Sequence, residues 1–498
     1  MKLRKTAVMA AVAVAAATAQ AKIEMGTPFS DGAVLQRGME VPVWGKAEPG
    51  AKVSVAFAGA EVSATACETG CWKVKLPAMS ASAEGRTMTV TESKAGFLWF
   101  DDETDRVDVK DVLVGEVWFA SGQSNMECPI WGDNPRYRDG AGALVTSMDH
   151  LPNLRFAKNN KAWSTAPQRA KSQGWKSYEP KSFAGYTLSA VAYYYARELY
   201  LALGGVPVGI VDASWGGTNI DAWTPRCGYE GCDPSLREVA AFKVTDKWNA
   251  SMKKGPIGRV HDQPTVLFNG MVDSWAPMAM RGFIWYQGCH NGSEPQLYAA
   301  KLHALRDGWA KRFENPALKI YLVQLAPYKT NWPGLVAAQT KYAEEEPLAA
   351  LAVTADVGNF DDIHPNSKEI VAKRLAVHAL KRDYGFDIAE DDSPVLKSVA
   401  FKDGAAEMTF KHAAGWYVYA PDRSVEPAFE VAGEDGVWKP AKLQNVTSRG
   451  NVTGKTLVVK SKDVPAPVKV RYLVRSRTMG SVYNQASLPL GPFSSDVR

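Results

Sequence analysis

The sequence predicts an α/β protein in which a parallel sheet of about five strands carries helices on both faces, with a smaller β module on each side. Two observations support this. Between residues 111 and 392, short apolar segments alternate with amphipathic segments of helical periodicity, whereas residues 22–110 and 393–498 contain only short β-rich segments separated by Gly and Pro. The length of 498 residues and the 46% hydrophobic content are sufficient for several folded domains.

The first 21 residues have the features of a signal peptide. Lys2, Arg4 and Lys5 precede an Ala/Val-rich run at 7–17, and the small-x-small sequence Ala-Gln-Ala at 19–21 is typical of a cleavage site. The apolar run is too short to span a bilayer of about 30 Å. We therefore expect a secreted or periplasmic protein that has no membrane attachment after cleavage.

The charge of the chain bears on nucleic-acid binding, and its cysteines bear on disulfides and metal sites. The chain has 58 Lys and Arg against 53 Asp and Glu, a formal charge of +5, and the basic residues are scattered, which argues against nucleic-acid binding. In an oxidising compartment, Cys67 with Cys71 and Cys227 with Cys232 are expected to form short disulfides, with free, buried thiols as the alternative. No Cys or His pair has the spacing of a zinc site, so no metal is predicted.

The predicted elements follow in order along the chain. Short strands at 41–44, 52–57 and 72–76 form the N-terminal β-sandwich-like module. Strands at 112–120, 206–213, 282–286, 320–325 and 351–355 alternate with helices at 189–203, 296–313 and 368–382. A Cys/Gly/Pro-rich stretch at about 225–263 interrupts this series and is interpreted as an insertion near the active face. Strands at 406–410, 456–460 and 468–472 form the C-terminal β module.

Polar residues follow several of these strands, at the edge where open α/β sheets bind ligands. Ser124 follows strand 112–120 at a strand-to-helix junction, where its hydroxyl is exposed and its N–H can face a developing oxyanion. From this loop alone, a helix-capping role for the serine is favoured over a catalytic one. After strand 206–213, Gly216 and Gly217 allow the backbone to approach a substrate closely.

The two remaining loops supply amides and an acid–histidine pair. Gln287 and Asn291 follow strand 282–286. Asp361 and Asp362 precede His364 by three and two residues, so that a carboxylate of the same loop can orient the imidazole. A nucleophile, backbone and amide donors, and an Asp/His pair on successive loops are together the parts of acyl transfer.

Four motifs resemble those of the SGNH hydrolases, and within them the sialate O-acetylesterase-like carbohydrate esterases. They are GEVWFASGQSNM at 115–126, ASWGGT at 213–218 followed by AW at 222–223, FIWYQG at 283–288 and DIHP at 362–365. The resemblance covers nearly the whole mature chain. It implies a flavodoxin-like three-layer SGNH core with appended β modules, in agreement with the pattern of elements.

The resemblance also implies roles for individual residues. Ser124 is expected to be the nucleophile and His364 the general base, with either Asp361 or Asp362 as the acid of the triad. The expected oxyanion hole comprises the N–H of Ser124, a glycine at 216 or 217, and the amide of Gln287 or Asn291. Trp215, Trp223 and Gln123 are expected to contact the substrate.

One loop departs from the pattern of its relatives, which usually have Gln-Gly-Glu-Ser-Asn where this chain has Cys289 and His290. This departure puts any role of the usual glutamate in doubt. It also suggests the hypothesis that Cys128 and Cys289 form a disulfide between two catalytic loops. A loop histidine such as His290 is more often a hydrogen-bonding neighbour than a second base.

The expected activity is removal of acetyl groups from sugar hydroxyls, with 9-O-acetylated sialic acid as the first candidate substrate. Acetylated xylan or xyloglucan is the alternative, as is a non-catalytic glycan-binding protein with a vestigial hydrolase core. An α/β-hydrolase is excluded because the Gly-x-Ser-x-Gly elbow is absent. Asp212 and Asp221 are interpreted as structural residues, not as a glycosidase pair. No metal or organic cofactor is implied, and the oligomeric state is not predicted.

Overall fold

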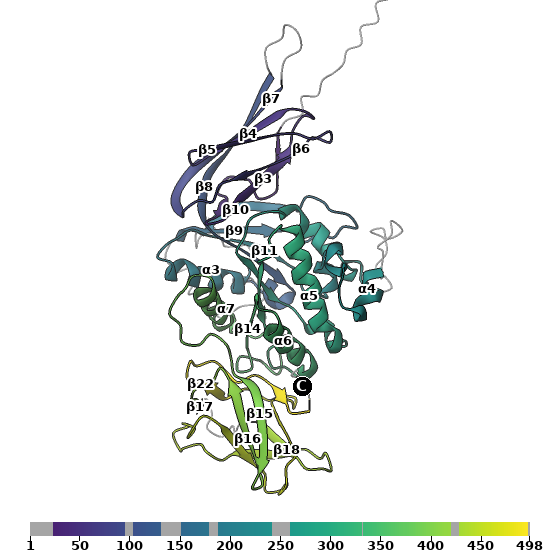
Figure 1. Cartoon of the computed structure of the whole chain (residues 1–498), viewed down its shortest axis with the longest axis vertical. Helices are drawn as coiled ribbons and strands as arrows, with labels where there is room; N and C mark the ends of the chain where they lie inside the picture. Colours follow the sequence, from purple (N-terminus) through teal and green to yellow (C-terminus); the bar gives the residue numbers. More distant parts are fainter. Residues whose placement is uncertain are drawn as a thin grey trace, which may run out of the picture.

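The computed structural model describes residues 23–94, 103–130, 151–178, 188–241, 259–330, 332–419 and 428–496. Three parts follow one another along the long axis of the molecule, with the helix-rich part between two β-rich parts (Figure 1). The predicted signal peptide at 1–21 lies outside the described residues. Within these ranges, no helix is both long and apolar enough to cross a membrane.

The N-terminal part contains two small antiparallel groups of strands. In one, β3 (Val41–Lys46) lies between β1 (Glu24–Met25) and β6 (Cys71–Leu76); in the other, β4 (Lys52–Phe57) lies between β5 (Ala60–Thr65) and β7 (Ser82–Lys94). Buried residues alternate with more exposed ones along β4 and β6, the pattern of strands that place one face on a core. The three strands predicted in this region are present.

One long strand joins this part to the central sheet. β8 (Glu103–Gly122) pairs antiparallel with β7, while β2 (Val34–Gln36) runs parallel beside its middle. Its last residues then pair in parallel with β11 (Val208–Ser214) and β12 (Gly282–Tyr286). Because the chain passes from one sheet to the next without a turn, the predicted boundary at 110/111 falls inside a continuous strand.

The central strands have the order β10-β9-β11-β8-β12-β13-β14. Neighbours are parallel from β9 (Leu151–Asn159) through β13 (Lys319–Val323) to β14 (Ala349–Ala352), and β10 (Ser172–Tyr178) is antiparallel at the edge. All five predicted strands occur. β9 and β10 were not predicted, because polar residues interrupt their apolar pattern and burial against the neighbouring strands determines their structure.

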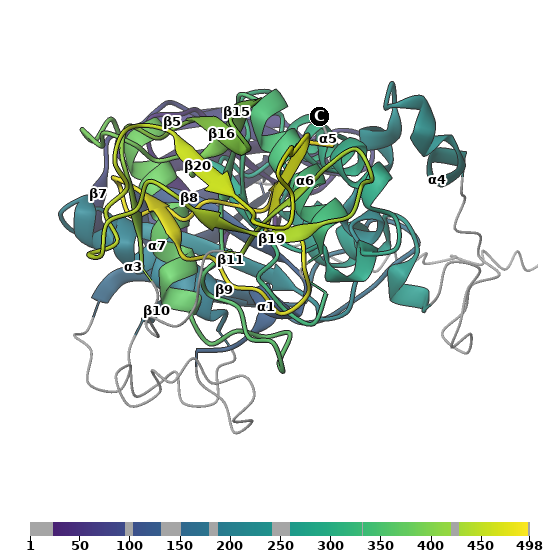
Figure 2. The same ribbon diagram turned by 90° about the horizontal axis from the view of Figure 1, so that it is seen from below.

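Two pairs of helices cover the central sheet. α3 (Ala190–Ala202) packs with α7 (Lys368–Arg382), and α5 (Pro295–Arg312) packs with α6 (Pro333–Glu345). The pairs lie on opposite sides of the strands (Figure 2). The three predicted helices correspond to α3, α5 and α7; α6 was not predicted.

Local sequence explains the ends of α3. The Ser189 hydroxyl accepts the N–H of Ala192 at 3.1 Å and so caps the first turn. Gly204 and Gly205 follow the last turn with φ of +67° and +85°, as the predicted C-cap requires. In the predicted insertion, the described residues form the short helices η3 (Arg226–Tyr229), η4 (Pro234–Leu236) and α4 (Arg237–Ala241), and residues 242–258 lie outside the described ranges.

The C-terminal part is a β module, as predicted. Its seven-stranded sheet is antiparallel and has the order β15-β16-β20-β19-β18-β21-β23, and a separate pair, β17-β22, lies beside it. The strands are β15 (Val395–Lys402), β16 (Ala405–Lys411), β17 (Trp416–Val418), β18 (Phe429–Ala432), β19 (Lys439–Leu443), β20 (Leu457–Lys460), β21 (Lys469–Tyr472), β22 (Val482–Asn484) and β23 (Phe493–Ser494).

Candidate active site

The carboxyl ends of three parallel strands lie side by side at one edge of the central sheet. Gly122, the last residue of β8, is paired with Ser214 of β11 on one side and with Tyr286 of β12 on the other. Gly122 has a φ of +139°, and a Cβ there would lie 2.3 Å from the carbonyl oxygen of Tyr286, so only glycine fits. The three loops that follow these strands are thereby brought together.

Ser124 begins α1 (Ser124–Glu127), a single helical turn directly beyond β8, and it is half-buried. The preceding Gln123 is buried, and its side-chain oxygen accepts the N–H groups of Gly288 at 3.1 Å and His290 at 3.3 Å. Gln123 therefore ties the loop after β12 to the serine turn. The Gln123 side chain is buried and holds this loop in place, which corrects the expectation that it contacts the substrate.

The serine turn is in direct contact with the loop that carries His364. Asn125 Nδ2 donates to the carbonyl oxygen of Ile363 at 3.0 Å, and Lys368 Nζ donates to Asn125 Oδ1. Asn125 and Lys368 are both buried. The residue after Ser124 is thus bonded to the residue before His364, which places the predicted nucleophile and base on adjoining loops at one rim of the sheet.

Of the two candidate acids, the structure places Asp362 beside the imidazole. Asp362 Oδ1 lies 3.3 Å from His364 Nδ1 and also accepts the backbone N–H of His364 at 2.9 Å. Asp361 points elsewhere: its carboxylate lies 3.1 Å from Arg477 Nη1 of the C-terminal module, and its side chain is 79% exposed. The expectation that Asp361 could be the acid of the triad is therefore corrected, because its ion pair with Arg477 directs its carboxylate away from the histidine.

The surroundings of His364 favour a neutral imidazole. Burial lowers its pKa from the usual value, and the nearby charge of Lys368 lowers it further, while the carboxylates of Asp362 and Glu127 raise it. The side chain is 15% exposed, but its Nε2 atom is buried. A neutral imidazole that a carboxylate orients through Nδ1 can accept a proton from a neighbouring hydroxyl at Nε2.

The two glycines after β11 lie against the serine. A Cβ on Gly216 would come within 3.2 Å of Ser124 Cβ, and Gly217 adopts a φ of +72°. The N–H of Gly216 donates to the Glu127 carboxylate at 2.6 Å, and the other oxygen of that carboxylate pairs with Lys161. In this structure Gly216 therefore faces an acceptor within the protein, not a vacant oxyanion position.

The two predicted amide donors are committed to a buried network. Gln287 Nε2 donates to the Thr218 carbonyl at 2.9 Å and to Asn291 Oδ1 at 2.7 Å, and Gln287 Oε1 accepts the Tyr298 hydroxyl at 2.6 Å. Asn291 Nδ2 donates to Glu294 at 2.5 Å. The expectation that either amide faces the oxyanion is corrected, because both side chains hold the loops after β11 and β12 together.

The two tryptophans predicted to contact the substrate lie in different surroundings, one at the rim of the site and one in the core. Trp215 is half-buried and stacks on His261, with ring centroids 4.6 Å apart and an angle of 16°. Trp223 is fully buried, and its Nε1 donates to Thr218 Oγ1 at 3.0 Å. Trp223 is thus corrected from substrate contact to core residue.

All six cysteines carry free thiols in the structure, so the predicted disulfides are not formed there. Between Cys67 and Cys71, the Thr69 hydroxyl lies 3.1 Å from one sulfur and 3.6 Å from the other. The hypothesised pair of Cys128 and Cys289 is likewise open, and burial raises the pKa of the Cys289 thiol to about 12. Thiol chemistry is therefore unfavourable beside the serine turn.

Other residues considered from sequence have structural partners. Asp212 pairs with Lys158 at 2.7 Å and Asp221 with Lys301 at 2.7 Å, which agrees with their interpretation as structural. His290 Nε2 lies 3.8 Å from Asp262 Oδ2, and the histidine side chain is 40% exposed.

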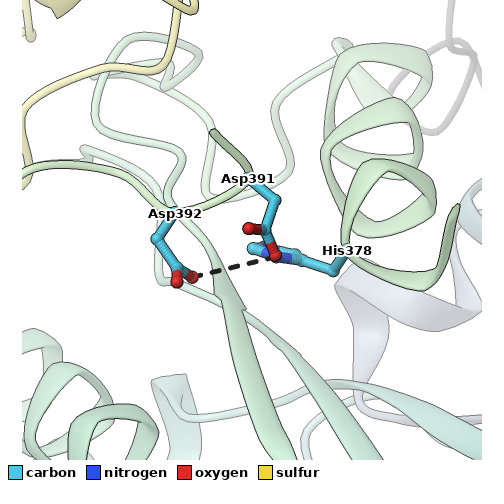
Figure 3. Close-up of side chains that lie close together, drawn as sticks. All are labelled: His378, Asp391 and Asp392. Carbon is cyan, nitrogen blue, oxygen red and sulfur yellow. Dashed lines mark hydrogen bonds and ion pairs between the residues drawn. The ribbon is translucent and has the colours of Figure 1, made fainter. Parts of the chain in front are cut away.

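One acid–histidine cluster elsewhere could be mistaken for a metal site. His378 of α7 faces Asp391 and Asp392, which lie on the segment leading to β15 (Figure 3). The His378 Nδ1 lies 3.1 Å from Asp391. Arg382 also contacts both carboxylates, at 2.5 and 2.6 Å. Because a cation already neutralises these acids, the cluster is better explained as an ion-pair junction between the α/β part and the C-terminal module.

Comparison with known proteins shows the family of the chain. Residues 114–381 match the family described as carbohydrate esterase, sialic acid-specific acetylesterase. The chain belongs to this family. As a carbohydrate esterase it is a hydrolase of ester bonds, and the matched segment includes Ser124, Gly216 and His364.

Relatives resemble this carbohydrate esterase over most of its length. The sialate O-acetylesterase of Homo sapiens is 24% identical over 450 residues, covering 82% of this chain and 80% of the human protein. The enzyme of that name from Mus musculus is 25% identical over 424 residues, covering 74% and 75%. A crystal structure of a carbohydrate acetylesterase from Xanthomonas citri is 31% identical, with a TM-score of 0.78, and covers 96% of this chain and 100% of that one.

Sequence reasoning missed three side chains of this candidate site. Asn125 and Lys368 join the serine and histidine loops, and Glu127 holds Gly216. Spacing offered a signal for two of them. Glu127 lies three residues after Ser124, on the same side of a helical turn, and Lys368 lies four residues after His364 at the start of α7.

Proposed function

We propose that this chain removes acetyl groups from sugar hydroxyls by a serine acyl-enzyme mechanism, with Ser124 as nucleophile, His364 as base and Asp362 as the orienting acid. The contact of Asn125 with Ile363 carries this proposal, because it holds the serine and histidine loops together. The ion pair of Asp362 with His364 Nδ1 leaves Nε2 as the nitrogen that takes the serine proton.

In the first half-reaction, His364 accepts the Ser124 proton while the serine oxygen attacks the acetyl carbonyl. The tetrahedral intermediate collapses when His364 returns the proton to the sugar oxygen, which leaves as the free hydroxyl. In the second half-reaction, water attacks the acetyl-serine with the same proton route, and acetate is released.

Backbone N–H groups stabilise the oxyanion in this proposal. Ser124 opens α1, so its N–H is one of the first-turn donors that have no acceptor within the helix. The segment at 216–217 supplies the second donor. Since Glu127 accepts the Gly216 N–H, the substrate oxygen uses Gly217, or Gly216 after displacing that carboxylate.

The substrate proposed first is 9-O-acetylated sialic acid, on the strength of the family and of relatives named sialate O-acetylesterase. Acetylated xylan or xyloglucan is the alternative, because the similar Xanthomonas citri protein is named only as a carbohydrate acetylesterase and its name specifies no sugar. We also propose that residues 1–21 direct export, and that 111–392 form the catalytic module with β modules at 22–110 and 393–498.

The test compares purified protein with the Ser124→Ala variant on p-nitrophenyl acetate. The proposal expects rapid acetate release that the substitution abolishes. Equal and negligible rates for both proteins would instead establish the glycan-binding alternative. Acetate release from mucin, compared with release from acetylated xylan, then assigns the sugar.

A further inference from the structure

Half-buried aromatic rings lie on both sides of the Ser124 turn. On the β11 side, the backbone N–H of Trp215 donates to the carbonyl oxygen of Gly122 at 3.1 Å, two residues before the serine. The ring of Trp215 is stacked on His261, and Lys161 Nζ lies over it, 5.7 Å from its centroid. The residue is only half-buried, so part of its surface remains open to solvent. A flat apolar ring beside a nucleophile suits the apolar face of a sugar ring.

On the other side, Tyr328 and Trp332 form a second platform. Both are half-buried, and their rings are nearly parallel, with an angle of 14° and centroids 6.4 Å apart. Trp332 lies against Gly292, where an added Cβ would come within 2.8 Å of its ring. It thus borders the loop after β12, whose Gly288 and His290 are bonded to Gln123, the residue before the nucleophile.

The same platform borders the histidine loop. The carbonyl of Pro327, next to Tyr328, accepts the N–H of Asn359 at 3.1 Å. The Asn359 side chain in turn accepts the N–H of Asp362 at 3.2 Å. Tyr328 and Trp332 therefore lie between the loops that carry His290 and His364.

The backbone of Trp332 is held in an unfavourable conformation. Its φ is +49°, in the left-handed region that non-glycine residues rarely adopt, and it precedes the first turn of α6. Such a conformation persists only where the surroundings enforce it, often at ligand sites. This observation is independent of the stacking geometry.

The strands that precede the two platforms lie well apart in the sheet. In the strand order, β11 and β13 are three positions apart, with β8 and β12 between them. At about 4.8 Å per strand, their ends are roughly 14 Å apart. Arg477 of the C-terminal module lies over the Phe360 ring at 5.5 Å and extends the rim beyond His364.

We propose that Trp215 on one side and Tyr328 with Trp332 on the other form a glycan cleft that binds a chain of several sugars across Ser124. The preferred substrate is thus an acetylated oligosaccharide, and an acetylated monosaccharide occupies only the centre of the cleft. This inference rests on the proposed function, since it places the acetyl group at Ser124.

The test measures kcat/KM for matched pairs: 9-O-acetyl sialyllactose against free 9-O-acetyl sialic acid, and acetylated xylohexaose against acetylated xylose. For the pair that the enzyme hydrolyses, the chain should exceed the single sugar by roughly tenfold, as expected for one lost aromatic contact. Trp332→Ala should reduce kcat/KM for the chain about tenfold more than for p-nitrophenyl acetate. Trp332→Phe and Tyr328→Ala should give smaller differences of the same sign.

Phe401→Ala is the matched control, because Phe401 is a 37% exposed aromatic on β15 of the C-terminal module. It should leave all ratios unchanged. The proposal of a cleft would be overturned if kcat/KM were the same for the chain and the single sugar. It would also be overturned if Trp332→Ala lost the same factor in kcat/KM on all substrates. If wild type does not hydrolyse p-nitrophenyl acetate, the proposed function fails separately. Tryptophan fluorescence titration of Ser124→Ala with unacetylated xylohexaose and sialyllactose then tests the cleft alone, and no binding to either refutes it.

Discussion

Replacing Asp362 by Asn removes the charge that faces His364 Nδ1 at 3.3 Å, while keeping an oxygen for the backbone N–H of His364. At this separation, two unit charges interact by about 5 kcal/mol at an effective dielectric constant near 20. The Asp362 side chain is 33% exposed, so water screens the pair. We therefore expect a loss of about 2–3 kcal/mol in the stabilisation of the imidazolium, or roughly 30- to 150-fold in kcat.

The assay is steady-state hydrolysis of p-nitrophenyl acetate by Asp362→Asn and by the neighbouring control Asp361→Asn. Asp361 lies in an exposed ion pair with Arg477, and such pairs contribute little, so its variant should lose less than about twofold. Circular dichroism of both variants checks that the fold is retained. A larger loss for Asp361→Asn than for Asp362→Asn would refute the assignment of the acid.

Three further predictions concern pH, stability and thiol reactivity. Glu127→Gln removes a negative charge that raises the pKa of His364. The acid limb of the pH profile of kcat/KM should therefore move to lower pH. Asp391→Asn breaks a buried ion-pair cluster and should lower the free energy of unfolding at pH 7 by about 3 kcal/mol, measured by urea denaturation. The thiol of exposed Cys67, whose pKa is lowered by hydrogen bonding from Thr69, should react with Ellman's reagent in the folded protein. Cys289 is only half-buried, but burial raises the pKa of its thiol to about 12, so it should react only after denaturation.

The pH dependence of stability provides the check on the Asp391 prediction. Its contacts with His378, Lys381 and Arg382 hold its pKa below the usual value, so the carboxylate stabilises the folded state above the unfolded pKa of about 3.9. This contribution is lost as pH falls through the depressed folded pKa, and it should be absent in Asp391→Asn. If the acid limb of the pH profile is the same in Glu127→Gln as in the wild type, the pH prediction is contradicted. If no thiol of the folded protein reacts with Ellman's reagent, the thiol prediction is contradicted.

The strands and helices of the central sheet could be predicted because their causes are local. Ser189 and the glycines at 204 and 205 mark the ends of α3, and the continuous apolar runs of β11 and β12 reflect burial on both faces. β9 and α6 escaped prediction because contacts with other elements determine them. The predicted boundary at 110 falls inside β8, because this strand pairs with β7 of the N-terminal part and with β11 of the central sheet.

The sequence by itself determined the types of residue at the strand ends and hence the chemistry they can perform together: a serine, a histidine, two aspartates and a glycine pair. Which aspartate meets the imidazole, and where each amide points, was decided only by tertiary structure. Adjacent carboxylates are equivalent in a linear chain, and only Arg477, more than 100 residues away, draws Asp361 from the histidine. Likewise, Gln287 and Asn291 have amides suited to an oxyanion hole, but folding buries them where the Thr218 carbonyl and neighbouring side chains accept their hydrogen bonds.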